Sequence, residues 1–191
     1  MKSLLLIIIS AALVNNFVLT RFLGICPFIG VSKKISSALG MGMAVTFVMT
    51  IASFVTWLLY HFVLLPFSIT FLQTIFFIIV IASLVQFLEL FIGKVSPILK
   101  ESLGIYLPLI TTNCAILGVS ILNIDKQYNL LESLGHSLGA GIGFTIAIII
   151  MAGVREKLES EEIPPFLKGV PISFITAGLL SIAFLGFSGL I

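Results

Sequence analysis

Residues 39–62 read LGMGMAVTFVMTIASFVTWLLYHF, a run of 24 residues without a single Asp, Glu, Lys or Arg. A helix needs roughly 20 consecutive apolar residues to cross the hydrocarbon core of a bilayer. In water, a helix that is apolar on all sides has to be surrounded by other protein. This run therefore predicts a membrane-spanning helix.

The composition of the whole chain supports the same interpretation. Apolar residues make up 59% and charged residues only 9% of the 191 residues, and the mean hydropathy is +1.26. Soluble domains usually carry about 25% charged residues. A net charge of +2 without a basic cluster excludes a nucleic-acid-binding protein. Two cysteines are too few for a disulfide framework. We expect an all-α integral membrane protein.

Six segments are long enough to enter or cross a bilayer, and polar or turn-forming residues separate them. They are Leu4–Phe22, Leu39–Phe62, Ile69–Ile92, Leu103–Leu122, Leu134–Val154 and Gly169–Leu190. The first resembles the start of a signal peptide, but no small-x-small cleavage site closes it, and we expect it to remain as the first span. The loops are too short for a soluble domain, so residues 1–191 are predicted to form a single membrane domain.

Two blocks of sequence recur in the same order along the chain. Residues 26–32 (CPFIGVS) match residues 114–120 (CAILGVS), and residues 39–46 (LGMGMAVT) match residues 138–145 (LGAGIGFT). Chance is the alternative explanation, because membrane sequences draw on few residue types. The shared order, and the presence of both cysteines in one block, favour an internal repeat.

Such a repeat divides the chain into halves of about 1–96 and 97–191, each with three spans. Because three is odd, the second half enters the membrane from the opposite side, so we predict six transmembrane helices arranged as two inverted three-helix repeats. Equivalent residues of the two halves then approach each other near the midplane. Cys26 and Cys114 would meet there.

Both cysteines lie where a helix is expected to break, so we predict broken or half helices at spans 1 and 4. The interrupting residues are Asn15, Asn16, Gly24 and Pro27 near the first cysteine, and Pro108, Thr111, Thr112, Asn113 and Gly118 near the second. Irregular backbone at membrane depth is tolerated where it is buried or lines a site. Thr112 and Asn113 are expected to orient or hydrogen-bond a bound group.

Cys26 and Cys114 are the candidate ligand residues, and no catalytic residue is expected. A buried free cysteine is often only a small apolar side chain, but the symmetric placement favours ligation. Thiolates suit soft metals and iron–sulfur clusters, and such clusters normally have four cysteine ligands. This chain has two, so a partner or a second copy would supply the others. His61 and His136, at predicted span ends, are interpreted as ordinary interface residues.

The distribution of Lys and Arg predicts the orientation, since these residues are in excess on the cytoplasmic side. With six spans, Lys2 and Lys126 share one side. The other side carries Arg21, Lys33, Lys34, Lys94, Lys100, Arg155, Lys157 and Lys168. Both termini are therefore predicted to lie outside the cytoplasm. Glu89, in the third span, is a candidate for ion coupling, although pairing with Lys94 is the favoured interpretation.

Five stretches match a known family of membrane proteins. They are residues 14–19 (VNNFVL), 22–28 (FLGICPF), 30–34 (GVSKK), 107–115 (LPLITTNCA) and 175–179 (ITAGL). They strongly resemble the NqrDE/RnfAE family, and the resemblance covers essentially the whole chain. The details at Asn15-Asn16 and Cys26-Pro27-Phe28 are more similar to the RnfA branch than to NqrE.

The resemblance implies an electron-transfer subunit of the Rnf complex, a ferredoxin:NAD⁺ oxidoreductase that moves Na⁺ or H⁺ across the cytoplasmic (inner) membrane of a bacterium or archaeon. It implies that Cys26 and Cys114 supply half of the ligands of a [2Fe–2S] cluster shared with an RnfE-like homologue of opposite orientation. Further implied partners are RnfB, RnfC, RnfD and RnfG, the last carrying a flavin.

The chain alone is not expected to be an enzyme, because no nucleotide-binding loop, flavin-attachment motif or catalytic triad is visible. The alternatives are an NqrE-like subunit of a Na⁺-translocating NADH:quinone reductase, a secondary transporter with a midplane site, and a scaffold for other redox subunits. The cysteine pair favours electron transfer, since a transporter has no need of symmetric thiols.

Overall fold

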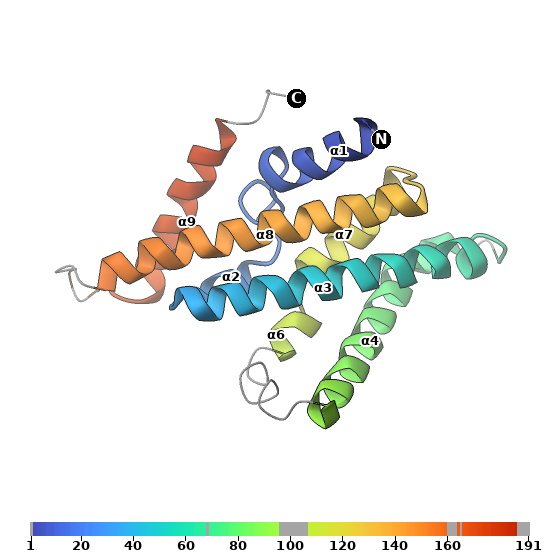
Figure 1. Ribbon diagram of the computed structural model, residues 1–191, viewed down its shortest axis with the longest axis horizontal. Helices are drawn as coiled ribbons and strands as arrows, with labels where there is room; N and C mark the ends of the chain where they lie inside the picture. Colours follow the sequence, from blue (N-terminus) through green and yellow to red (C-terminus); the bar gives the residue numbers. More distant parts are fainter. Residues whose placement is uncertain (1, 68, 96–106, 160–163, 165, 187–191) are drawn as a thin grey trace.

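The computed structural model describes residues 2–67, 69–95, 107–159, 164 and 166–186, and all regular structure in these ranges is helical (Figure 1). The long helices are α3 (Ile35–Leu59), α4 (Gln73–Val95), α8 (Leu130–Glu159) and α9 (Val170–Leu185). The shorter ones are α1 (Lys2–Ile9), α2 (Ile25–Val31), α6 (Leu107–Thr111) and α7 (Cys114–Asp125). Two π-helical turns (Ser10–Val14 and Tyr60–Leu64) and a 3₁₀ turn (Thr70–Leu72) adjoin α1, α3 and α4.

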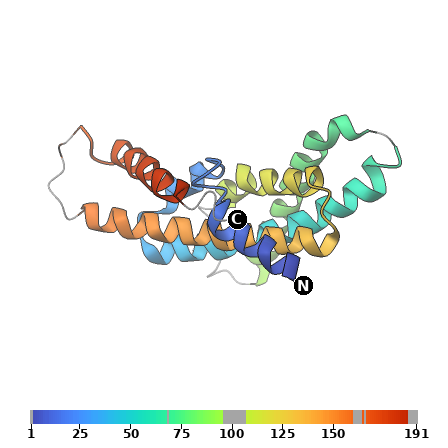
Figure 2. The ribbon, with the colours of Figure 1, turned by 90° about the horizontal axis from the view of Figure 1, so that it is seen from above.

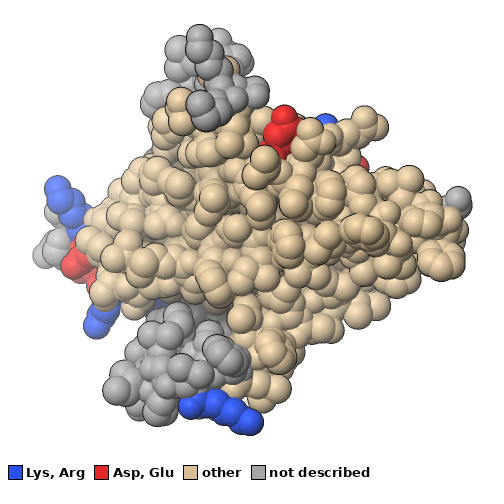
Figure 3. All heavy atoms as spheres, turned by 45° about the vertical axis from the view of Figure 1, so that its right-hand side comes forward, with Lys and Arg blue, Asp and Glu red and all other residues tan. Residues whose placement is uncertain are grey.

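Four helical stretches in the described part of the chain are long and apolar enough to cross a bilayer. They are Ile35–Leu64, Thr70–Leu90, Pro108–Asp125 and Leu130–Glu159, and the shorter apolar helices are Leu4–Val14 and Val170–Leu185. Figure 3 shows charged side chains at the margins of one face and a broad area between them without charge. This surface is that of a multi-pass membrane protein.

The predicted second, third and fifth spans are confirmed, and α8 is longer than expected at both ends. The predicted break in span 1 is also confirmed, because its helical part ends at Val14 and the chain continues irregularly to Gly24. Span 4 breaks between α6 and α7, and residues 103–106 of the predicted segment lie outside the described residues. The last helix ends at Leu185, and residues 187–190 of its predicted segment also lie outside them.

The centre of the molecule is an antiparallel pair formed by α3 and α8, which lie side by side in both views (Figures 1 and 2). At one end of the pair, the indole Nε1 of Trp57 donates a hydrogen bond to the carbonyl of Tyr128 at 3.0 Å. Near the middle, Gly42 faces Thr145 and Gly141 faces Thr46, each with room for a hydrogen but not for a Cβ. Small residues allow such close packing between membrane helices, where the hydrophobic effect contributes little.

Helix α1 and the π-helical turn that follows it run along the first half of α8. A Cβ at Gly139 would lie 2.6 Å from the carbonyl oxygen of Ile8, and one at Gly143 would lie 2.7 Å from that of Ala12. The absence of a side chain at these two glycines therefore lets the backbones approach each other. Gly40, by contrast, has open space where its Cβ would be.

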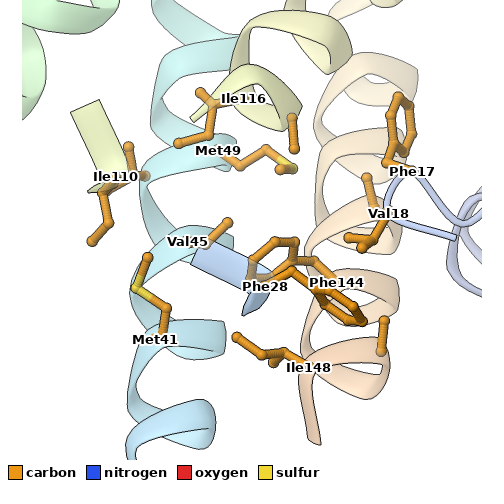
Figure 4. Close-up of a cluster of buried hydrophobic side chains, with 14 of the residues drawn as sticks. Phe17, Val18, Phe28, Met41, Val45, Met49, Ile110, Ile116, Phe144 and Ile148 are labelled. Atoms are coloured by element: carbon orange, nitrogen blue, oxygen red, sulfur yellow. The ribbon is translucent and has the colours of Figure 1, made fainter. Parts of the chain in front are cut away.

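The hydrophobic core lies where the short helices meet the central pair. Figure 4 shows Phe28 from α2, Phe144 from α8 and Val45 from α3 in one cluster of buried side chains. Phe28 and Phe144 are each 1% exposed, and Val45 is fully buried. The core therefore holds α2 against the middle of α8.

Candidate functional site

The structure brings the two cysteine-bearing segments into direct contact. The backbone N–H of Gly24 donates to Sγ of Cys114, with 2.9 Å between nitrogen and sulfur. Cys26 follows two residues later, in the first turn of α2. Leu23 adds a second contact, since its Cδ1 lies 2.7 Å from where a Cβ of Gly118 would be. Residues separated by about 90 positions in the sequence thus form one site.

Gly24 has the backbone conformation that this contact requires. Its φ is +82°, a left-handed conformation that glycine adopts without steric cost. A Cβ here would lie 3.1–3.2 Å from the side chains of Ala115, Asn113 and Phe144. Any larger residue would push the first cysteine segment away from the second.

Helix α7 begins at Cys114 and is capped by the residue before it. The Oδ1 atom of Asn113 accepts the N–H of Ala115 at 3.0 Å, the arrangement preferred at a helix start. The other half of this amide, Nδ2, is buried and has no hydrogen-bond partner. A buried donor without an acceptor is rare and calls for a functional or structural reason. Here the unpartnered donor, Nδ2, belongs to Asn113, the residue directly before Cys114.

The two cysteines differ in exposure: Cys26 is exposed and Cys114 is partly buried. Among the residues that the structure describes, no group of three or more His, Cys, Asp and Glu side chains is placed to hold a metal ion. The chain therefore offers one exposed and one partly buried thiol. The side chains that the structure describes do not complete a four-ligand site.

Helix α8 holds the far ends of both cysteine helices, one at each of its own ends. Toward its C-terminus, Nη1 of Arg155 donates to the carbonyl of Ile29 at 2.6 Å and to Oγ of Ser32 at 2.9 Å. Toward its N-terminus, His136 and Ser137 contact Asn123 near the end of α7. The two helices consequently start together beside Phe144, near the middle of α8, and diverge toward opposite ends.

The irregular segment before Cys26 is organised by Asn16, which is fully buried. Its Nδ2 donates to the carbonyl of Gly143 at 2.8 Å, and its Oδ1 accepts from the N–H of Val18 at 3.0 Å. Ser181 of α9 fastens the same segment through a hydrogen bond from its hydroxyl to the carbonyl of Leu19. The sequence marked Asn16 as a helix interruption, but only the fold shows it as an anchor.

Three sequence-based expectations need correction. Gly118 does not interrupt a helix but lies inside α7. His136 is not an ordinary interface residue, because it is 4% exposed and its Nδ1 lies 2.7 Å from Oδ1 of Asn123. His61, by contrast, is exposed and stacks on Trp57 with 3.9 Å between ring centroids.

The third correction concerns Arg21. Its guanidinium lies 5.9 Å from the ring centroid of Phe17, whose ring in turn meets His136 near the start of α8. Arg21 is therefore on the Lys126 side of the molecule and not on the side of Lys33. Glu89 is partly buried in α4, and its pairing with Lys94 stays a prediction.

Comparison with known proteins agrees with this architecture. The sequence profile of the family described as "Rnf-Nqr subunit, membrane protein" matches residues 4–191. A protein of Syntrophotalea carbinolica, named as a subunit of an "Ion-translocating oxidoreductase complex", is 58% identical over 191 residues, covering 100% of this chain and 99% of that protein.

Two further relatives carry more specific names. A protein of Acetobacterium woodii, named as a subunit of a "Na(+)-translocating ferredoxin:NAD(+) oxidoreductase complex", is 56% identical over 188 residues, covering 98% of each chain. A protein of Clostridium ljungdahlii, named as a subunit of a "Proton-translocating ferredoxin:NAD(+) oxidoreductase complex", is 54% identical over 191 residues, covering 100% of this chain and 99% of that protein. With matches over its full length, this chain belongs to the Rnf-Nqr family of membrane protein subunits.

Proposed function

We propose that this chain is the RnfA-type subunit of an Rnf-type ferredoxin:NAD⁺ oxidoreductase that translocates Na⁺ or H⁺. In this proposal Cys26 and Cys114 supply half of the ligands of a [2Fe–2S] cluster, and an RnfE-like homologue supplies the rest. The observation that carries it is the hydrogen bond between Gly24 and Cys114, which joins the two cysteine segments.

The residues present suit such a group. Two thiols are half of the four that a cluster normally needs, and exposure of Cys26 leaves room for a partner's ligands. N–H groups stabilise the charged sulfur atoms of iron–sulfur sites. Gly24 provides one toward Cys114, and the unpartnered Nδ2 of Asn113 is available as another. When bound, the cluster would accept and pass on single electrons.

The position of the site supports a role in carrying electrons across the membrane. Gly24 packs against Phe144, near the middle of α8, and α8 is long enough to span a bilayer. A charged group at that depth is costly, and proteins retain such groups for function. Electrons would pass between the cytoplasmic iron–sulfur subunit and the flavin of RnfG.

The inverted repeat is part of the proposal. Gly42 and Gly141 occupy equivalent positions in the two matched blocks, as do Thr46 and Thr145. Gly42 packs on Thr145 while Gly141 packs on Thr46, so the contacts are reciprocal. A two-fold axis that relates the halves and lies in the membrane plane produces reciprocal contacts of this kind.

We also propose that both termini lie outside the cytoplasm. When Arg21 is counted on the side of Lys126, the Lys and Arg residues divide into seven on the side of Lys33 and three on the side of Lys126, in place of eight and two. The excess still favours the cytoplasm for the end that carries Lys33 and Lys34.

The cysteines can be tested in the purified complex. Cys26→Ser and Cys114→Ser should abolish the electron paramagnetic resonance signal of the cluster and ferredoxin-dependent NAD⁺ reduction, while the subunit stays in the membrane. Ser36→Ala, an exposed change at the start of α3, is the matched control and should alter neither. An intact signal and full activity in Cys114→Ser would refute the ligand assignment. Normal electron transfer without either cysteine would leave a scaffold role.

A further inference from the structure

A second, polar site lies at the end of the molecule where α8 begins. It is a cavity of about 210 Å³ between α1, the π-helical turn after it and the connection from α7 to α8. Its polar lining consists of Ser10, Asn15, Lys126, Tyr128 and His136. None of these residues belongs to the cysteine site.

His136 offers this cavity a hydrogen-bond acceptor. Its Nδ1 lies 2.7 Å from Oδ1 of Asn123, whose Nδ2 donates to Oγ of Ser137 and to the carbonyl of Ser133. Because Oδ1 can only accept, Nδ1 carries a hydrogen, and when the ring is neutral Nε2 is the acceptor. A ligand beside this ring is therefore favoured if it carries a hydroxyl group.

Lys126 adds a positive charge to the same lining. Its Nζ lies 5.5 Å from the ring centroid of Tyr128. The nearby acids, Asp125 and Glu132, are not among the lining residues, and Oε2 of Glu132 accepts the N–H of Asn129 at 3.1 Å. On the opposite wall of the cavity, Nδ2 of Asn15 donates to Oγ of Ser10 at 3.2 Å. The lining suits an anion that also has hydroxyl groups.

The rest of the lining is apolar and comes from α1 and the π-helical turn that follows it. Leu6, Ile7 and Ala11 complete the wall, and Leu6 is 54% exposed, next to Leu5 at 61%. The cavity lies at the level where α7 ends and α8 begins, which is the expected membrane boundary. There its polar lining from the α7–α8 connection meets its apolar lining from α1. Its volume is below the ~300–1,000 Å³ of pockets that enclose a whole drug-sized ligand, which suits a headgroup whose acyl chains stay outside.

We propose that this cavity binds the headgroup of an anionic phospholipid that carries free hydroxyls, of the phosphatidylglycerol type. Lys126 pairs with the phosphate, Nε2 of His136 accepts from a glycerol hydroxyl, and Leu6 and Ile7 contact the first part of the acyl chains. A Lys or Arg side chain near the membrane surface attracts anionic lipid headgroups. The inference does not depend on the cysteine site.

The test uses the whole delipidated complex in detergent, titrated with short-chain lipids and followed by calorimetry. Lys126→Gln should weaken binding of dihexanoyl-phosphatidylglycerol about fivefold, as expected for one cation near a lipid phosphate. Lys34→Gln, an exposed lysine at the opposite end of the molecule, is the matched control and should leave binding unchanged. Equal affinity in Lys126→Gln and the unaltered complex would overturn the proposal.

Two further ligands separate the parts of the inference. Dihexanoyl-phosphatidylpropanol has the same charge but lacks the hydroxyls, and it should bind more weakly than phosphatidylglycerol. Equal binding would overturn the role given to His136. Inorganic phosphate should compete poorly because it lacks the apolar part, and competition at equal concentration would show that the site takes a free anion and not a lipid.

Discussion

The hydroxyl oxygens of Thr46 and Thr145 lie 3.4 Å apart at the crossing of α3 and α8. Each threonine also bonds back to its own helix: Oγ1 of Thr46 donates to the carbonyl of Gly42 at 2.7 Å, and Oγ1 of Thr145 donates to that of Gly141 at 2.8 Å. The two sides of the crossing are chemically equivalent. Each glycine leaves room for the threonine side chain of the opposite helix, so the two helices pack closely at this crossing.

Close packing of α1 on α8 predicts unequal responses to the same substitution along one helix. Gly139→Ala places a Cβ 2.6 Å from the carbonyl oxygen of Ile8, and backbone cannot move aside as a flexible side chain can. We expect a loss of about 1–3 kcal/mol, measured as a lower midpoint of thermal unfolding. Gly153→Ala has open space around its Cβ and is the control. It should be neutral or stabilising by up to ~1 kcal/mol, because alanine favours the helix.

The crossing itself predicts a rescue. Gly42→Ala brings a Cβ within 2.6 Å of Cγ2 of Thr145, so this variant should lose stability by about 1–3 kcal/mol. Adding Thr145→Ala removes Cγ2 and Oγ1, the two nearest of the obstructing atoms, and should restore most of the loss. Additive losses in the double variant would show that the two positions do not constrain each other.

Gly24→Ala tests whether the contact between the cysteine segments is needed for the proposed cluster. The positive φ and the 3.1–3.2 Å contacts of a Cβ both oppose alanine at this position. We expect the purified complex to lose most of its [2Fe–2S] signal although both cysteines remain. Gly30→Ala, whose Cβ would meet only Leu109 at 3.8 Å, is the control within α2. A full signal in Gly24→Ala would show that this contact is dispensable.

Asn113→Ser separates the two halves of this side chain. Serine keeps an oxygen that caps α7 but removes the unpartnered Nδ2 donor. If Nδ2 donates a hydrogen bond to a charged sulfur of the cluster, removing it should destabilise the reduced state by about 1.5 kcal/mol. This free energy corresponds to a roughly tenfold change in the equilibrium constant for reduction. For a one-electron couple, the reduction potential of the cluster would be about 59 mV lower. A redox titration followed by paramagnetic resonance measures the shift.

The control for this experiment lies one residue earlier. Thr112 is exposed, and its hydroxyl donates to the carbonyl of Pro108 at 3.0 Å. Thr112→Val should therefore leave the potential unchanged. An unchanged potential in Asn113→Ser, with a normal signal, would remove Asn113 from the site and leave the cysteine ligands in place.

Arg155 is expected to stabilise the far end of α2. Arg155→Met removes two hydrogen bonds from a charged donor, to Ile29 and Ser32. It should lower the free energy of unfolding by about 1–2 kcal/mol, since the side chain is only partly buried. Ser32→Ala removes one of the two bonds and should cost less. A thermal-unfolding series in detergent would show the order, and equal losses in both variants would argue against the backbone contact.

The proposed orientation predicts opposite labelling of the two ends. A membrane-impermeant maleimide should react with Lys126→Cys in intact cells, but with Lys34→Cys only after the membrane is opened. Both lysines are exposed, so accessibility of the side chain is matched. The unaltered chain controls for reaction at Cys26. Labelling of Lys34→Cys alone in intact cells would reverse the assignment.

Much of the fold could be predicted from the sequence because it depends on local chemistry. Long apolar runs such as residues 39–62 indicate spans, since an uninterrupted run of this length matches the thickness of the hydrocarbon core of a bilayer. Asn15 and Asn16 likewise indicate a break, because their side chains compete for backbone hydrogen bonds. Gly118 misled the prediction, because a glycine that makes room for Leu23 looks the same in sequence as one that ends a helix.

By itself the sequence determined membrane residence, the broken first and fourth spans, and the pairing of Cys26 with Cys114 as candidates. Only the tertiary structure decided that Gly24 donates to Cys114, that Asn16 anchors the connecting segment, and that Arg155 and His136 contact the far ends of α2 and α7. Membrane residence and the breaks follow from transfer of side chains and backbone into lipid, which each segment undergoes separately, and the cysteine pair follows from the repeated block around each cysteine. The second group consists of contacts between residues about 90 to 130 positions apart or between neighbouring helices, and their partners are set by packing of the whole chain.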